Sequence, residues 1–82
     1  MTQMQVINLI AHHTREVLPS LDAHVFVPSD RLADLGANSV DRAEIAMLVQ
    51  ESLGISVPRI ELFGPRNVGE LADLFRKKIN AA

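Results

Sequence analysis

The sequence predicts an all-α fold, a small four-helix bundle with a long first loop and a short third helix. Apolar residues recur every three or four positions in three segments, which is typical of amphipathic helices. Residues that favour helix starts precede each segment, and Pro or Gly follows the first two. With 82 residues, a second core would leave neither half enough buried surface, so we expect a single domain over residues 1–82.

The first helix is expected over residues 3–18. Thr2 and Gln5 fit a capping box, in which each side chain accepts a hydrogen bond from the backbone N–H of the other residue. Pro19 then ends the helical spacing because it lacks the backbone N–H that a continuing helix needs. The apolar face comprises Val6, Ile7, Ile10, Thr14, Val17 and Leu18.

A connection of about twenty residues follows, from Pro19 to Asn38. Loops of this length in compact domains are usually functional or pinned. The segment HVFVP, residues 24–28, has no evident strand partner, so we expect its three central side chains to dock over the bundle. These side chains are Val25, Phe26 and Val27.

A helical turn is expected in the second half of this connection, within SDRLADLG, residues 29–36. Such a turn would direct Leu32 and Leu35 inward. Gly36 permits a positive φ if the chain must reverse direction there. The connection therefore leads into the next helix through a compact turn.

The second helix is expected from Ser39 to about Leu53, with Asn38 as N-cap, Asp41 at the third position and Gly54 just past the end. Its residues form two stripes. One stripe suits the core and comprises Ile45, Leu48, Val49, Ser52 and Leu53. The other mixes apolar residues with carboxylates and should be partly exposed; it comprises Val40, Ala43, Glu44, Met47 and Glu51.

The last helix is expected over residues 68–80, with Asn67 as N-cap and Glu70 at the third position. Between the second and last helices, Pro58 and Pro65 bracket a connection with one short helical turn. The stripe of the last helix comprises Val68, Leu71, Ala72, Phe75 and Ile79. From both stripes we assign Ile45, Val49, Leu71 and Phe75 to the core.

Composition excludes several classes of function. The net charge of -2 lacks the attraction that drives non-specific nucleic-acid binding, so we expect no nucleic-acid partner. No apolar run approaches the roughly 20 residues needed to span a bilayer, and the first residues lack a signal-peptide pattern. We therefore expect no membrane partner and a cytoplasmic protein. The chain contains no Cys, so any thiol chemistry requires an added group.

The sequence contains no enzyme motif around Ser39, a candidate nucleophile whose hydroxyl we expect to be exposed. A G-x-S-x-G elbow is absent, and the spacing of His12, His13 and His24 relates none of them to this serine. His12 and His13 are adjacent and lack the i, i+4 spacing that lets two imidazoles share an ion. We therefore expect solvated histidines, no metal and no catalytic residue.

The run Asp34-Leu35-Gly36-Ala37-Asn38-Ser39-Val40-Asp41 resembles the serine motif of the acyl carrier proteins, and the resemblance extends over essentially the whole chain. It implies the acyl-carrier type of helical bundle. It also implies that a separate phosphopantetheinyl transferase attaches 4′-phosphopantetheine to the Ser39 hydroxyl. The thiol of that arm carries acyl groups as thioesters, so the protein itself is not an enzyme.

Partners of such a carrier must recognise the surface around the arm. We expect this partner face to comprise Val40, Asp41, Arg42, Ala43, Glu44, Met47 and Glu51. Asn38 stands where the family usually has Asp, so a charge–dipole stabilisation of roughly 0.3–1 kcal/mol is absent beside Ser39. Together with Arg42, this departure suggests a specialised partner.

A narrower resemblance concerns GANSVDRAEI and PRIELFGPRNVGELADLF, which look like the discrete donor carriers of polyketide β-branching cassettes. That resemblance implies an acetyl group donated to an HMG-CoA-synthase-like enzyme and supplied by a ketosynthase or acyltransferase. We expect the carrier to be a monomer. The alternatives are a fatty-acid-type or other polyketide carrier and, from another class, an unmodified helical interaction module.

Overall fold

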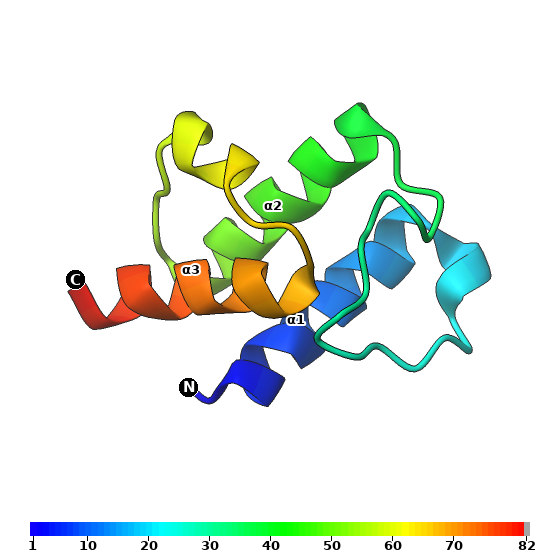
Figure 1. The fold of residues 1–82 in the computed structure, drawn as a ribbon, viewed down its shortest axis with the longest axis horizontal. Helices are drawn as coiled ribbons and strands as arrows, with labels where there is room; N and C mark the ends of the chain where they lie inside the picture. Colours follow the sequence, from blue (N-terminus) through cyan, green and yellow to red (C-terminus); the bar gives the residue numbers. More distant parts are fainter. Residues whose placement is uncertain (82) are drawn as a thin grey trace.

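The computed structural model describes residues 1–81 and contains three α-helices, α1 (Gln3–Val17), α2 (Ser39–Leu53) and α3 (Val68–Ala81). Two 3₁₀ helices, η1 (Pro19–Leu21) and η2 (Arg59–Phe63), lie in the connections (Figure 1). There is no strand in residues 1–81. The all-α prediction is therefore confirmed, whereas the expected short third helix is a 3₁₀ helix. The predicted count of four helices is thus not observed as α-helices.

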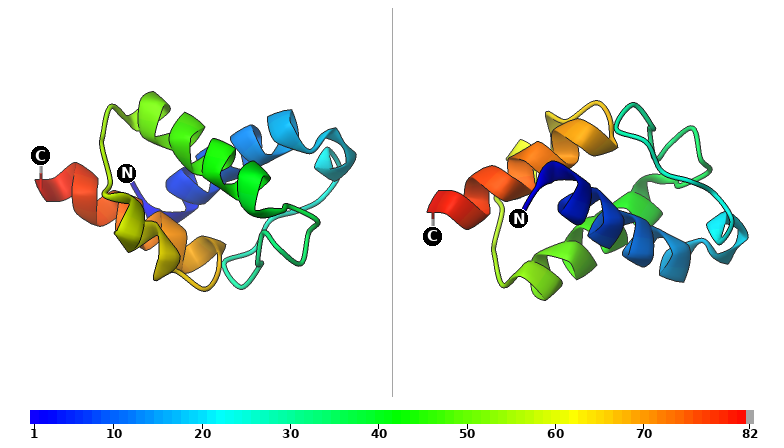
Figure 2. Two further views of the ribbon diagram at one scale, coloured as in Figure 1. Left: turned by 90° about the horizontal axis from the view of Figure 1, so that it is seen from above. Right: turned by 90° about the horizontal axis from the view of Figure 1, so that it is seen from below.

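α1 is the central element, and it packs against both α2 and α3. Figures 1 and 2 show α1 lying across the other two helices, with η2 above α3 and beside α2. Met1 lies against α3, where Arg76 Nε donates a hydrogen bond to the Met1 carbonyl oxygen over 3.2 Å. Within the described residues, no helix is long and apolar enough to cross a bilayer.

The helix ends follow the predicted caps closely. Thr2 and Gln5 form the capping box of α1, and Asn67 Oδ1 accepts a 2.8 Å hydrogen bond from the Glu70 N–H at the start of α3. Gly54 ends α2 with φ of 66°, a left-handed conformation that favours glycine. α1 ends one residue earlier than the predicted range, and α3 ends one residue later.

One apolar core joins the three helices. It contains the predicted Ile45, Val49 and Phe75, all fully buried, while Leu71 is half-buried and packs against it. Ser52 was assigned to the core stripe but is exposed, because it lies at the end of α2 where its hydroxyl can reach a polar partner on α1. The remaining core residues are Val6, Ile7, Ile10, Ala11, Phe26, Leu32, Ala37, Ala46, Val57, Val68 and Ala72.

The long loop is pinned to the start of α3. The Asp30 carbonyl oxygen accepts a 2.8 Å hydrogen bond from the Val68 N–H, and the Pro28 carbonyl oxygen accepts one of the same length from Gly69. Helix starts leave such N–H groups without a partner inside the helix. These two bonds therefore satisfy N–H groups at the start of α3 and hold the loop against that helix. Among the described residues, the loop has no strand, as expected.

Docking of the HVFVP segment is only partly as predicted. Phe26 is buried, with the Arg15 guanidinium 5.1 Å from its ring centroid and the His24 ring nearly perpendicular to it at a centroid distance of 4.8 Å. Val25 and Val27 are exposed, so the prediction that they dock was wrong. An extended segment places successive side chains on opposite sides, which leaves room for only one of the three to enter the core.

The Asp30 carboxylate organises this part of the loop. It accepts hydrogen bonds from the Val27 N–H and from His24 Nε2, each over 2.9 Å. Burial raises the pKa of the Asp30 carboxyl, but these hydrogen bonds and the charge of His24 outweigh it, so the pKa is lowered from 3.8. The charged form therefore stabilises the loop above that value, and this contribution is lost as the pH falls through the lowered pKa.

Replacing Phe75 with Ala should destabilise the domain by about 3–5 kcal/mol, because the fully buried ring would leave a cavity beneath α3. Denaturant titration followed by circular dichroism measures this loss. Phe63→Ala removes the same ring from an exposed position and serves as the control, with an expected change below about 0.5 kcal/mol. A loss below about 1 kcal/mol for Phe75→Ala would contradict the burial of this ring in the core.

Replacing Gly69 with Ala should also lower stability, by about 1–3 kcal/mol, although Ala favours helices over Gly. A Cβ at residue 69 would lie 2.9 Å from Pro28 Cβ and 3.0 Å from the Pro28 carbonyl oxygen, so the pinned loop would have to move. Gly64→Ala is the control, since its Cβ would meet only the Glu61 carbonyl oxygen at 3.4 Å. A higher melting temperature for Gly69→Ala would contradict this prediction, because it would show that the loop moves without loss of stability.

Candidate functional site

Ser39 is the first residue of α2 and is exposed to solvent. In the described part of the chain, its hydroxyl forms no hydrogen bond. Asn38 before it caps the helix: its Oδ1 accepts a 2.8 Å bond from the Asp41 N–H, and its own N–H donates to Asp41 Oδ2 over 3.1 Å. The sequence predicted Asn38 as the cap and Asp41 as the third residue, but not the second hydrogen bond, from the Asn38 N–H to the Asp41 carboxylate.

The turn before Ser39 is fixed to the core. Leu32 and Ala37 are buried, and the Ala37 N–H donates a 3.0 Å hydrogen bond to the Leu32 carbonyl oxygen. Gly36 between them has φ of 103°, which confirms the predicted positive φ. Arg42 Nη1 donates to the Ala37 carbonyl oxygen over 2.7 Å and ties the turn to α2. The backbone therefore presents the Ser39 hydroxyl in a defined place.

An open groove lies beside Ser39, between α2 on one side and η2 and the start of α3 on the other. The α2 wall contributes Ser39, Val40, Glu44 and Met47, whereas the other wall contributes exposed side chains of η2 and the segment after it. Apolar side chains of Ala46, Val57, Leu62, Val68 and Leu71 also line the groove. The sequence did not predict this groove, because it forms between elements that are distant along the chain.

The predicted partner face is on the surface. Val40 is 72% exposed and Met47 is 51% exposed, so apolar area is left uncovered beside the carboxylates. Asp41 is less exposed than the other members, because its carboxylate takes part in the cap. The remaining members, Arg42, Ala43, Glu44 and Glu51, are exposed. Recognition of these residues by a partner stays a prediction.

Charge at this end of α2 favours an anion next to Ser39. Helix N-termini carry a partial positive charge, and Ser39 is at the first helical position. No histidine is among the residues that line the groove beside Ser39. The arrangement therefore offers an exposed hydroxyl at a helix start, with no imidazole in this groove beside it.

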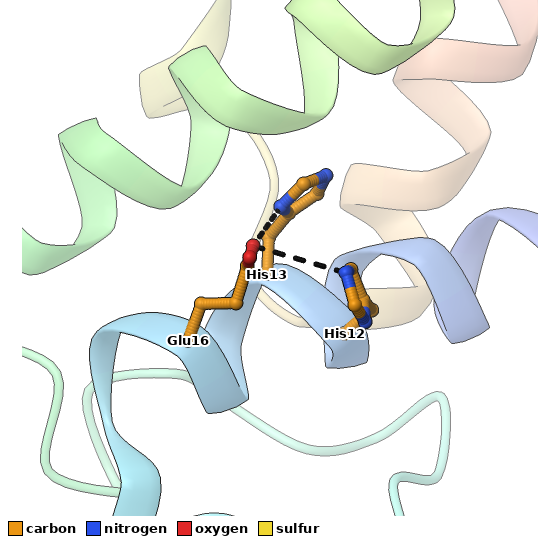
Figure 3. A group of neighbouring side chains, drawn as sticks. All are labelled: His12, His13 and Glu16. Carbon is orange, nitrogen blue, oxygen red and sulfur yellow. Dashed lines mark hydrogen bonds and ion pairs between the residues drawn. The ribbon is translucent and has the colours of Figure 1, made fainter.

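The histidines lie elsewhere, and one prediction about them was wrong. His13 was expected to be solvated but is buried between α1 and α2, with Nδ1 bonded to Glu16 and Nε2 bonded to the Ser52 hydroxyl over 2.7 Å. His12 is exposed, and its Nε2 lies 3.9 Å from Glu16 Oε1 (Figure 3). The missed signal is the position of His13 three residues after Ile10, on the apolar face of α1.

His12, His13 and Glu16 place three potential ligand atoms within 4.8 Å of one another, as a metal site requires. Both ring nitrogens of His13 already have partners within the protein, so an ion would have to displace one of them. The network instead joins the end of α2 to α1. The expectation that the protein binds no metal stays a prediction.

Comparison with known proteins gives three concordant matches. The family model described as "Phosphopantetheine attachment site" matches residues 5–75. The chain is 46% identical over 82 residues, the full length of both chains, to the "Polyketide biosynthesis acyl-carrier-protein AcpK" of Bacillus subtilis (strain 168). It also resembles a chain in the crystal structure of the curacin biosynthetic pathway HMG synthase in complex with acetyl donor-ACP. That match has a TM-score of 0.89 and 50% identity, and covers 95% of this chain and 100% of the other.

Proposed function

The chain belongs to the family of phosphopantetheine attachment domains, and from this membership we propose that it is an acetyl donor in polyketide β-branching, with Ser39 as the attachment site. Members of this family are carriers rather than enzymes, and their cofactor is 4′-phosphopantetheine. The observation that carries the attachment site is the exposed, unbonded hydroxyl of Ser39 at the fixed start of α2.

The surroundings of Ser39 fit the cofactor. The attachment joins the Ser39 oxygen to phosphorus, which places a negative phosphodiester at the positive end of the α2 macrodipole. The open groove beside Ser39 leaves the arm free to leave the protein surface. When bound, the arm supplies the thiol that a chain without Cys lacks. A phosphopantetheinyl transferase is therefore the first partner that we propose.

Two comparisons support the donor assignment. The Bacillus subtilis relative is a polyketide carrier of the same length, and the matched structural chain belongs to a complex of an HMG synthase with an acetyl donor-ACP. Since 95% of this chain covers the whole of that matched chain, the matched chain has the size of a carrier domain. We propose that this protein likewise presents acetyl to an HMG-CoA-synthase-like enzyme after a ketosynthase or acyltransferase supplies it.

The partner face agrees with such a role. Carboxylates at the edge of an interface mainly accelerate and orient the encounter, whereas a central apolar side chain contributes more to the lifetime of the complex. Glu44 and Met47 lie on the same wall of the groove as Ser39, so a partner that covers them would also reach the arm. We propose that the synthase binds this wall.

Incubation with coenzyme A and a phosphopantetheinyl transferase should add one phosphopantetheine group, and Ser39→Ala should abolish the addition. Intact-protein mass spectrometry measures the gain, and peptide mapping locates it. Ser29→Ala, which removes an exposed loop hydroxyl, is the control and should load normally. Loading of the Ser39→Ala variant, or attachment at Ser20, Ser29 or Ser52, would refute this site.

Acetyl-loaded protein should acetylate the curacin-pathway HMG synthase faster than an acetyl-loaded fatty-acid carrier does. Glu44→Lys should slow the transfer about tenfold at low salt and less at high salt, because screening weakens steering. Met47→Ala should weaken the complex by a similar factor with little salt dependence, since it removes apolar contact. Transfer rates and affinities at two ionic strengths measure both effects.

Two matched controls accompany these variants. Met4 on α1 is 47% exposed, an exposed fraction similar to that of Met47. Met4→Ala therefore removes the same kind of side chain from a position outside the groove. Asp22→Lys adds the same charge change as Glu44→Lys at an exposed loop position. Equal acetylation by this protein and by the fatty-acid carrier would refute the donor assignment while leaving the carrier assignment intact.

A further inference from the structure

Arg42 is a cation close to the proposed attachment site. It lies three residues after Ser39 on α2, and residues three apart on a helix are neighbours, with roughly 5–6 Å between their Cβ atoms. Long side chains on a helix lean toward its N-terminus, which directs the Arg42 side chain toward the turn that carries Ser39. The observed contact agrees, because Arg42 Nη1 donates a 2.7 Å hydrogen bond to the Ala37 carbonyl oxygen. The guanidinium therefore lies at the end of α2 where Ser39 begins the helix.

The Arg42 guanidinium is only partly engaged by this contact. A guanidinium has several N–H donors, and within residues 1–81 the bond to Ala37 is the one hydrogen bond that this group donates. The side chain is exposed, so its other donors face solvent. The neighbouring carboxylate does not take them, because Asp41 Oδ2 accepts a 3.1 Å hydrogen bond from the Asn38 N–H. The remaining donors are available to an anion.

The backbone around Ala37 holds the guanidinium in place. Ala37 is buried, and its N–H donates a 3.0 Å hydrogen bond to the Leu32 carbonyl oxygen. The backbone N–H of Arg42 donates to the Asn38 carbonyl oxygen over 2.9 Å, so both ends of the side chain are tied to this junction. Because the planar guanidinium is already restrained, a second hydrogen bond costs little further ordering of the side chain.

The anion that would meet this group is a phosphodiester. Attachment of phosphopantetheine at Ser39 places a negatively charged phosphodiester on the serine oxygen, next to Arg42 on the helix surface. Guanidinium groups match the oxygens of a phosphate in geometry as well as in charge. Asn38, the residue before Ser39, caps the helix without a charge of its own, so its side chain does not compete for the guanidinium.

We propose that Arg42 binds the phosphodiester of the phosphopantetheine arm and so fixes the attached end of the arm at the start of α2. This inference rests on the proposed function, because it requires the arm on Ser39. The guanidinium keeps its bond to the Ala37 carbonyl oxygen and adds a charge-assisted hydrogen bond to a phosphate oxygen. The thiol end of the arm stays free to move, whereas the direction in which the arm leaves the protein is set. Arg42 is thus a positioning residue.

The first test compares the melting temperatures of the apo form, without the arm, and the holo form, with it. Arg42→Gln removes the bond to Ala37 in both forms, so that loss cancels when the effect of loading is compared between the two proteins. Loading should raise the melting temperature of the wild type by about 2–4 °C more than that of Arg42→Gln, as expected for an exposed ion pair in a small domain. This excess should shrink at high salt. An equal effect of loading on both proteins would overturn the proposal.

Arg59→Gln is the matched control, because it removes the same charge from the same groove. Arg59 comes shortly after Val57, whose N–H donates a hydrogen bond to Gln50 Oε1 near the other end of α2. At about 1.5 Å for each helical residue, Gln50 lies roughly 16 Å from Ser39, beyond the screening length of about 10 Å at 0.1 M salt. Loading should therefore stabilise Arg59→Gln as much as the wild type. If Arg59→Gln loses as much of the effect as Arg42→Gln does, net charge alone accounts for the result and the proposal is overturned.

The second test observes the guanidinium by NMR of the arginine Nε–Hε groups in the apo and holo forms. The spectrum of apo Arg42→Gln assigns the Arg42 resonance by its absence. In the wild type this resonance should shift on loading by more than that of Arg59. Because only wild-type protein is loaded here, the measurement decides the question even if the transferase does not accept Arg42→Gln. An Arg42 resonance that loading leaves unchanged would overturn the proposal.

Failure of this inference differs in outcome from failure of the proposed function. If mass spectrometry finds no phosphopantetheine on Ser39, the proposed attachment site fails. If wild-type protein is loaded on Ser39, but the Arg42 resonance is unchanged and loading stabilises wild type and Arg42→Gln equally, only this inference fails. In that case Arg42 holds the turn before Ser39 and does not bind the arm.

Discussion

The structure depends on one shared surface, the apolar face of α1. Val6, Ile7 and Ile10 on that face are fully buried, and both α2 and α3 pack against it. A domain of 82 residues has room for a single core, so each of the other helices buries one stripe there. Among residues 1–81, no helix covers the second stripe of α2, which stays exposed. The surface that we assign to partners is thus a consequence of how few elements share the core.

The long loop turns this small core into a defined site. Two N–H groups at the start of α3 donate hydrogen bonds to the Pro28 and Asp30 carbonyl oxygens and so hold the middle of the loop. The end of the loop is held by Ala37, buried before the cap of α2. Two helix starts are therefore linked through one connection, and Ser39 occupies a fixed place beside the groove. Such a carrier contributes position and recognition, while its partners contribute catalysis.

The sequence by itself determined the features that depend on neighbours within a few residues. The caps at Thr2, Asn38 and Asn67, and the left-handed Gly54, were all predictable, because each involves a hydrogen bond or a φ angle within one helical turn. Helix limits followed from the same signals to within a residue. The serine motif identified the family and the proposed site, since that motif is contiguous in the chain.

Only the tertiary structure decided which side chains of the long loop face inward and which side chains meet across elements. It buried Phe26 but neither of its valine neighbours, and it placed His13 between two helices against Ser52. It also brought η2 opposite α2, which makes Phe63 part of the groove beside Ser39. Each of these outcomes depends on contacts between residues far apart in sequence. Periodicity describes a face within one element, whereas the packing of elements against a shared core selects what that face meets.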